Sequence, residues 1–113
     1  MEIKVNDYVR TKKGYICKIL EIHDEYSDDY LDWNDIHSAS IRKSRVVKNS
    51  PNIIDLIEVG DYVNGLPVRF IEKDRIDIGQ TEDYFWLKNK HIKSVLTKEQ
   101  FEQMEYKIES EVN

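Results

Sequence analysis

The sequence predicts a mainly β protein built from two tandem copies of one small unit. The segment Ile3-Lys-Val-Asn-Asp-Tyr-Val9 returns 54 positions later as Ile57-Glu-Val-Gly-Asp-Tyr-Val63, with five of the seven residues identical. The same offset carries Asp29-Tyr30-Leu31 onto Asp83-Tyr84-Phe85. Repetition at a fixed spacing is typical of a duplicated structural unit. We therefore expect the two halves of the chain to follow the same path.

Length and composition are compatible with two such units in one body. The chain has 113 residues, of which 40% are hydrophobic and 35% are charged, so it can build a core and keep a polar surface. The repeat divides it into residues 1–56 and 57–113, and units of this size lie near the lower limit for independent stability. Each unit gains when the other covers its exposed apolar surface, so we expect two subdomains packed together.

The first unit opens with two strands around a turn. Arg10-Thr-Lys-Lys-Gly14 supplies that turn and ends in glycine, which tolerates positive φ. The return strand, residues 15–22, breaks its apolar alternation near Lys18-Ile19, and such a break indicates a β-bulge. Further strands are expected at residues 30–33 and 40–47, which carry β-branched and aromatic side chains.

Short helical turns follow the strands in both units. Ser50 is a capping residue and Pro51 suits the first position of a helix, so residues 51–56 are predicted to form a single turn. In the second unit, Asn64-Gly65 is a strong signal for a tight hairpin. Thr97-Lys-Glu-Gln100 is a capping box that opens a short helix. The remaining strands of the second unit are expected at residues 66–71, 76–78, 84–87 and 91–96.

Four or five short strands per unit, with short helical turns, are the layout of a small and partly open β-barrel. The predicted fold class is therefore mainly β, with two tandem small five-stranded barrels of the Src-homology type that arise from an internal duplication. Asp7 and Asp61 are expected to support the neighbouring turns through hydrogen bonds from side chain to backbone. The valines of the repeated segments are expected to be buried: Val5, Val9, Val59 and Val63.

The charge balance disfavours a protein that binds duplex nucleic acid. The formal net charge is −5, whereas a surface that neutralises phosphates usually shows as an excess of Lys and Arg. Residues 23–35 carry six carboxylates. A local basic run follows them, formed by Arg42, Lys43, Arg45 and Lys48.

The composition also predicts a cytoplasmic location and no membrane partner. No apolar run approaches the roughly 20 residues of a membrane span, and the first residues lack the pattern of a signal peptide. Cys17 is the single cysteine and cannot form an internal disulfide, which agrees with a reducing compartment.

No set of residues in the sequence points to catalysis, a metal or a cofactor. The three histidines lack the close spacing of a zinc site, and Cys17 has no second sulfur partner. The acidic residues 24–35 contain no glycine, which a calcium loop requires at its centre. The four glycines are isolated and form no phosphate-binding loop. A nucleophile with a base and an orienting acid can be assembled only by free choice, so we predict a protein that is not an enzyme.

Aromatic residues gather at two places in the sequence, around residues 26–33 and 84–86. In small barrels such residues can line a groove for a peptide or form a stacking platform for single-stranded nucleic acid. They can equally fill the two cores. We expect Leu31 and Phe85 in the core, together with one of each Tyr or Trp neighbour, and the remaining aromatic side chains partly exposed.

Two resemblances bear on function. Val5-Asn-Asp-Tyr-Val-Arg-Thr-Lys-Lys-Gly-Tyr-Ile-Cys-Lys-Ile19 resembles the opening of KOW-type barrel motifs. Lys48-Asn-Ser-Pro-Asn-Ile-Ile-Asp-Leu-Ile-Glu-Val-Gly-Asp-Tyr-Val-Asn-Gly65 and His91-Ile-Lys-Ser-Val-Leu-Thr-Lys-Glu-Gln-Phe-Glu102 resemble small proteins encoded by phages and prophages of clostridia and related Firmicutes. The second resemblance implies a bacterial host cell as the setting. Some small phage proteins inhibit host defences such as CRISPR nucleases.

Two functional hypotheses follow. The first is a non-enzymatic interaction protein of phage type that binds and modulates a host protein, with an anti-CRISPR-like inhibitor as its narrower form. Its acidic residues 24–35 would meet a basic nucleic-acid channel of that host protein. The alternative is a KOW-like module that binds nucleic acid or the ribosome through the basic run at residues 42–48. The predicted partner-binding residues are Asp28, Asp29, Asp32, Trp33, Asp35, Tyr84 and Trp86.

Overall fold

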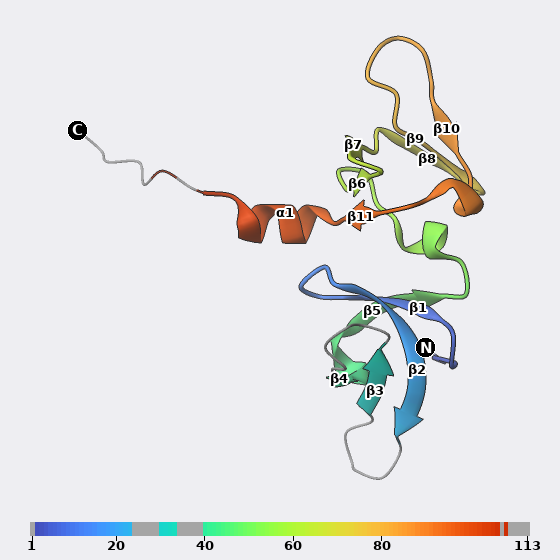
Figure 1. The fold of residues 1–113 in the computed structure, drawn as a ribbon, viewed down its shortest axis with the longest axis vertical. Coiled ribbons are helices and arrows are strands. Elements are labelled where there is room, and N and C mark those ends of the chain that lie inside the picture. The colour runs from blue at the N-terminus through green and yellow to red at the C-terminus, as the bar shows by residue number, and fades with distance from the viewer. Residues whose placement is uncertain (1, 24–29, 34–39, 107, 109–113) are drawn as a thin grey trace.

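The computed structural model describes residues 2–23, 30–33, 40–106 and 108. Two lobes of β-structure lie one above the other in Figure 1, and the C-terminal helix leaves from the level between them. Within the described residues the protein is mainly β, with three small antiparallel sheets and one short α-helix. The predicted mainly β class is therefore confirmed.

The first lobe is a five-stranded sheet with strand order β4-β3-β2-β1-β5. The strand β2 is the longest, and its register with β3 shifts between Ile19 and Glu21. This irregularity confirms the predicted bulge, one residue further along the chain than expected. The elements are β1 (Tyr8–Thr11), β2 (Ile16–His23), β3 (Tyr30–Trp33), β4 (Ser40–Arg42), the 3-10 helix η1 (Lys43–Arg45) and β5 (Val46–Ser50).

The second lobe contains two three-stranded sheets, ordered β10-β9-β8 and β11-β6-β7. The 3-10 helix η2 (Ile53–Leu56) connects the lobes, and α1 (Lys98–Met104) follows the last strand. The other elements are β6 (Tyr62–Val63), β7 (Leu66–Pro67), β8 (Phe70–Glu72), β9 (Arg75–Asp77), β10 (Trp86–Leu87), the 3-10 helix η3 (Asn89–His91) and β11 (Val95–Leu96).

The two lobes share one strand order. The second lobe has two sheets, with strand orders β10-β9-β8 and β7-β6-β11. If β7 and β8 together are taken as the counterpart of β2, these orders placed end to end correspond to the order β4-β3-β2-β1-β5 of the single sheet in the first lobe. The chain changes partner between them, because Val68 N donates to Asp61 O at 2.8 Å and Arg69 N donates to Asp77 O at 2.9 Å. In the first lobe Ile19 N donates to Asp7 O at 2.9 Å, immediately before the bulge of β2.

Beyond this correspondence in strand order, the structure does not show the two predicted five-stranded barrels. None of the sheets closes into a barrel in the part of the chain that the structure describes. In the second lobe each strand is only two or three residues long. Strands this short make few ladder hydrogen bonds, so the strands of the second lobe form two separate sheets instead of one.

The repeated segment forms the same turn twice. Asp7 Oδ2 accepts a hydrogen bond from Lys4 N at 3.0 Å, and Asp61 Oδ2 accepts one from Glu58 N at 2.8 Å. The third residue of each turn has positive φ, 74° at Asn6 and 97° at Gly60. Both aspartates are buried. The predicted role of the two aspartates is therefore confirmed.

The prediction for the four valines is half wrong. Val9 and Val63 are fully buried, but Val5 and Val59 are exposed. Each exposed valine is the second residue of the repeated turn, which is closed by a backbone bond from the aspartate N to the O of the first residue. A side chain at that position points away from the sheet, because the chain reverses there.

The second repeat match does not correspond to equivalent positions in the fold. Tyr30 and Leu31 belong to β3, whereas Tyr84 and Phe85 precede β10, the edge strand that occupies the place of β4. The turn between β8 and β9 is short, and the following loop, residues 78–85, is long. Structurally equivalent residues of the two lobes are therefore no longer 54 positions apart after the first strand. Phe85, expected in the core, is exposed, and Leu87 is buried instead.

Each lobe has its own hydrophobic core. The core of the first lobe consists of Ile3, Val9, Cys17, Ile19 and Val46. The core of the second lobe consists of Ile54, Ile57, Val63, Val68, Ile76, Ile78 and Leu87. Ile16 of β2 packs against the second core, so the lobes also share apolar contact.

The local signals for turns and caps are confirmed. Asn64 and Gly65 join β6 to β7 with φ of 52° and 84°, as a tight hairpin requires. Thr97 Oγ1 accepts from Gln100 N, and Gln100 Oε1 accepts from Thr97 N, which is the predicted capping box of α1. The cap expected at Ser50 and Pro51 is the exception, because η2 begins at Ile53 and its N-cap is Asn52, which makes no side-chain capping hydrogen bond.

Candidate functional site

Two of the predicted partner-binding residues come together on the second lobe. Tyr84 and Trp86 stack with ring centroids 5.3 Å apart and planes inclined by 14°. Asp32 and Trp33 belong to β3, and the structure describes no contact of theirs that tests the prediction. Asp28, Asp29 and Asp35 lie outside the described residues. The site that the structure supports is therefore built around Tyr84 and Trp86.

These two rings belong to one face of the β10-β9-β8 sheet. Phe70 of β8 and Trp86 of β10 both lie opposite Asp77 of β9 in the strand register. Residues directly opposite one another share a face of a sheet, so both rings lie on the face that carries Asp77. The rings of Phe70 and Tyr84 have centroids 5.8 Å apart. Phe70, Tyr84 and Trp86 thus form a continuous row, here named the aromatic surface.

Two arginines lie against the aromatic surface. Arg75 Cζ is 4.0 Å from the centroid of the Trp86 ring, and Arg69 Cζ lies 5.7 Å from Phe70 and 5.9 Å from Tyr84. All three distances are within the range of cation–π attraction. Each arginine also has a carboxylate partner, Glu72 at 2.8 Å from Arg75 and Asp77 at 2.9 Å from Arg69.

Asp77 lies beneath the rings and is fully buried. Its Oδ2 accepts from Arg69 Nε at 2.9 Å, and its Oδ1 accepts from Gly79 N at 2.9 Å and Phe85 N at 2.7 Å. Burial disfavours the carboxylate, but the hydrogen bonds from Phe85, Gly79 and Arg69 outweigh it and hold the pKa of Asp77 below its ordinary value. One ionised carboxylate therefore ties both ends of the loop that presents Tyr84.

Arg69 completes the support of this loop. Its Nη1 donates to Thr81 O at 2.6 Å and its Nη2 donates to Asp83 O at 3.1 Å. The loop also passes close to Gly79, where a Cβ atom would lie 2.4 Å from Asp83 O and 2.5 Å from Arg69 Nη2. Only glycine fits at this position.

The aromatic surface is open to solvent although its backbone is well supported. Tyr84 is 59% exposed and Phe70 is 50% exposed. Trp86 is half-buried, and Phe85 and Ile71, which are neighbours of these residues in the sequence, are also exposed. Apolar side chains that gather on a surface mark an interaction site more often than scattered ones do. The arrangement can bind a partner by stacking and apolar contact.

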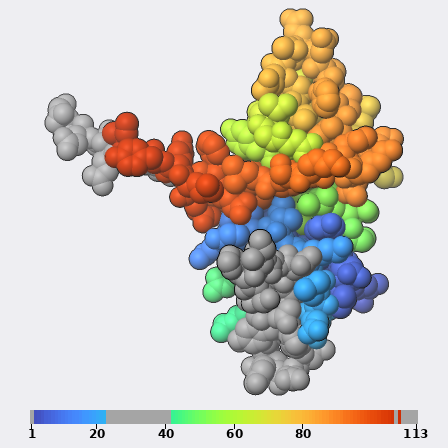
Figure 2. All heavy atoms as spheres, viewed as in Figure 1, coloured from blue at the N-terminus to red at the C-terminus, as the bar shows by residue number. Residues whose placement is uncertain are grey.

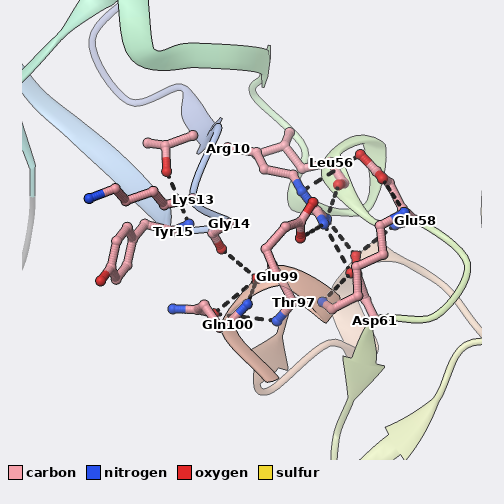
Figure 3. A network of polar contacts seen from close by, with 12 residues as sticks. Arg10, Lys13, Gly14, Tyr15, Leu56, Glu58, Asp61, Thr97, Glu99 and Gln100 are labelled. Carbon is pink, nitrogen blue, oxygen red and sulfur yellow. Dashed lines mark hydrogen bonds and ion pairs between the residues drawn. The ribbon is translucent and has the colours of Figure 1, made fainter. Parts of the chain in front are cut away.

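A second conspicuous cluster lies between the lobes and is built around Arg10 (Figure 3). Arg10 was expected in the turn at residues 10–14, but it belongs to β1 and its side chain is fully buried. Its Nη1 donates to Leu56 O at 3.0 Å, and both terminal nitrogens donate to the carboxylate of Asp61. Its Nη2 also donates to Glu99 Oε2 at 2.6 Å. Arg10 therefore joins the first lobe to η2, to the repeated turn of the second lobe and to α1.

Glu58 extends this cluster to the surface. Its carboxylate lies 2.8 Å from Lys98 Nζ, 3.0 Å from Lys48 Nζ and 3.6 Å from Arg10 Nε. The hydrogen bond from Lys98, together with those positive charges, lowers the pKa of Glu58 to about 2. Thr97 Oγ1 donates to Gly14 O at 2.7 Å on the other side. Because the arginine at its centre is buried and paired, we assign this cluster a structural role in joining the lobes.

The described residues show no further candidate for chemistry. None of their His, Cys, Asp and Glu side chains gather in a group of three or more that could hold a metal ion. Cys17 is buried in the core of the first lobe. The helices of the described chain are too short to cross a membrane.

Comparisons with known proteins add no assignment. No family model matches the chain, and no curated protein or solved structure matches it significantly.

Proposed function

We propose that the protein is a non-enzymatic interaction protein that binds another protein through the aromatic surface. The observation that carries this proposal is the row of Phe70, Tyr84 and Trp86 on a loop and strands held by the ion pair of Arg69 with the buried Asp77. Trp, Tyr and Arg are the residues that contribute most often to protein–protein binding energy. Support from beneath lowers the entropy cost of binding, because the rings are already ordered.

The pairing of the arginines favours a protein over a nucleic acid as partner. A surface for single strands combines stacking aromatic rings with cations that neutralise phosphates. Here Arg69 and Arg75 already have carboxylate partners at 2.9 Å and 2.8 Å. Using them against phosphates would cost those ion pairs.

The proposed partner is a protein of a bacterial host cell. This part of the proposal rests on the resemblance to small phage and prophage proteins, and so does its narrower form, an inhibitor of a host defence of the anti-CRISPR kind. The contribution of Asp28, Asp29, Asp32 and Asp35 to the encounter with a basic partner stays a prediction.

A nucleic-acid module is the second candidate, because three lysines lie close in sequence to the residues of the aromatic surface. Lys73, Lys88 and Lys90 line one hollow, and Lys73 and Lys88 are two residues from Arg75 and Trp86. Binding of a labelled oligonucleotide that weakens steeply with salt and is lost in Trp86→Ala would support this candidate. A protein partner would show the same dependence on Trp86 after nuclease treatment.

The proposal is tested by photo-crosslinking followed by binding measurements. A photoreactive phenylalanine analogue at Phe85 would be compared with the same analogue at Val59, an exposed residue of the repeated turn that is remote in sequence from the loop. We expect a defined protein adduct in nuclease-treated host cells from position 85 and none from position 59. Adducts that are equal at both positions, or that vanish with nuclease, would overturn the proposed protein partner.

A further inference from the structure

At and beyond the end of the C-terminal helix the chain carries a further group of apolar side chains that are largely exposed. The helix α1 is attached to the body by Glu99, by the stack of Phe101 on Tyr62 at 5.1 Å, and by Gln103 Nε2, which donates to Lys13 O at 2.9 Å. Beyond that point Met104 is 77% exposed. Tyr106 and Ile108 are still more exposed, at 88% and 84%. We name Met104, Glu105, Tyr106 and Ile108 the C-terminal arm.

The arm stands out from the side of the body. Figure 2 shows α1 leaving the molecule at the level of the lobe boundary, and in Figure 1 α1 extends toward the side away from the β10-β9-β8 sheet. An arm anchored in this way presents its side chains to another molecule more readily than to its own second lobe.

The C-terminal segment and a hollow of about 810 Å³ in the second lobe have opposite net charge. From Glu102 onward the sequence carries four glutamates and one lysine. The hollow is lined by Lys73, Lys88 and Lys90, of which Lys73 and Lys88 lie two residues from Arg75 and Trp86 in the sequence. Asp55 and Asp74 also line this hollow, and Asp55 accepts a hydrogen bond from Ser50 Oγ. None of the three lysines forms an ion pair with a described residue.

We propose that the C-terminal arm of one copy binds the aromatic surface and the lysine-lined hollow of a second copy. Met104 and Tyr106 would pack on the rings, since thioether and aromatic groups both make favourable contacts with aromatic side chains. Glu105 would lie against the lysines. The exchange is reciprocal, because the same two surfaces exist on each copy, and it closes as a two-fold dimer.

This inference goes beyond the proposed function, since it requires no host protein. It implies that in the free dimer the arm of each copy covers the aromatic surface of the other copy. A host partner must then displace the arm. Charge attraction makes the dimer sensitive to salt, whereas apolar packing sets its residual strength.

Sedimentation equilibrium of the full chain over a range of protein and salt concentrations tests the proposal. We expect a mass of twice 13.5 kDa at high protein concentration and low salt, and dissociation as salt rises. The double variant Met104→Ser/Tyr106→Ser and the variant Trp86→Ala should each weaken the dimer at least tenfold. Val59→Ser, an exposed change elsewhere, should leave it unaltered. A synthetic peptide of residues 101–113 should bind the Met104→Ser/Tyr106→Ser protein and quench or shift its Trp fluorescence.

Two outcomes would overturn the dimer. The full chain would remain monomeric at every concentration, or a dimer would persist unchanged in both the arm variant and Trp86→Ala. A monomeric protein that still gives the crosslink at position 85 rejects the dimer alone. A dimer without any such crosslink rejects the proposed function alone.

Discussion

Arg69 and Asp77 form an ion pair of 2.9 Å beneath an exposed row of aromatic rings. The same carboxylate accepts from the backbone N–H groups of Gly79 and Phe85, so one side chain fixes the loop between them. A loop that presents Tyr84 for contact is thus built on a buried charge. This arrangement explains how a surface with so little regular structure keeps its aromatic side chains in order.

Gly79→Ala should disturb the aromatic surface without affecting the rest of the fold. The added Cβ would meet Asp83 O and Arg69 Nη2 at 2.4 and 2.5 Å, so the loop must shift and Tyr84 must move off Trp86. We expect a loss of about 1 to 3 kcal/mol in unfolding free energy and a changed Trp emission spectrum. Gly65→Ala is the matched control, because its backbone φ of 84° is strained but no atom lies within 4 Å of a Cβ there. Equal spectra for the two variants would contradict the tight fit at Gly79.

Arg10→Met should destabilise the protein by about 3 to 5 kcal/mol, because it leaves the buried carboxylate of Asp61 without its partner. Arg75→Met removes an ion pair in which both side chains are exposed and should cost about 1 kcal/mol or less. Urea unfolding of the two variants measures the difference directly. Similar losses for both would show that the lobes do not depend on the cluster around Arg10.

Asp61→Ala should be several times more destabilising than Asp7→Ala. Both aspartates accept the same backbone hydrogen bond in their turn, which is worth about 1 kcal/mol. Asp61 also pairs with Arg10 and accepts from Lys98 N at 2.9 Å, at the start of α1. Thermal melts of the two alanine variants test this, and an unchanged melting temperature for Asp61→Ala would contradict its role in both the turn and the lobe junction.

Glu58 should make the stability of the protein depend on pH in the acid range. Its pKa in the folded protein is about 2, below the ordinary value of 4.5, so its ionised form favours folding. Its contribution is fully present above pH 4.5 and is lost as the pH falls toward 2. We expect the wild-type protein to be more stable than Glu58→Gln at neutral pH, with a difference that shrinks across this interval. A difference that stays constant from pH 7 to pH 2 would contradict the ion pairs drawn at Glu58.

Features that depend on neighbouring residues were predictable from the sequence. The turn roles of Asp7 and Asp61, the Asn64-Gly65 hairpin and the Thr97 capping box all involve partners within three residues. The bulge in β2 was predictable because alternation breaks where the strand bends. The exposure of Tyr84 agrees with the expectation that some of the aromatic side chains lie partly at the surface, whereas its role in binding a partner stays a prediction.

Features that depend on distant partners were not predictable. Nothing near Arg10 in the sequence marks it as buried, since most arginines are exposed, and its acceptors on Asp61 and Glu99 are 51 and 89 positions away. Asp77 sits between Ile76 and Ile78 and resembles the outward residue of an alternating strand. Its burial depends on Arg69 and on the loop that folds over it. The prediction of barrels was wrong because strand length decides whether a sheet can close, and the ends of strands are poorly marked in a sequence.

The most direct test of the central claim is the affinity of the crosslinked host protein, once purified, for Tyr84→Ala, Trp86→Ala and the control Tyr15→Ala. Tyr15 is exposed on the first lobe and lies outside the aromatic surface. We predict that each of the first two substitutions weakens binding at least tenfold, because truncation of a central aromatic side chain typically costs more than about 1 kcal/mol, while Tyr15→Ala binds like the wild type. Unchanged affinity in both Tyr84→Ala and Trp86→Ala, with folds intact by circular dichroism, would contradict the claim that this surface binds the partner.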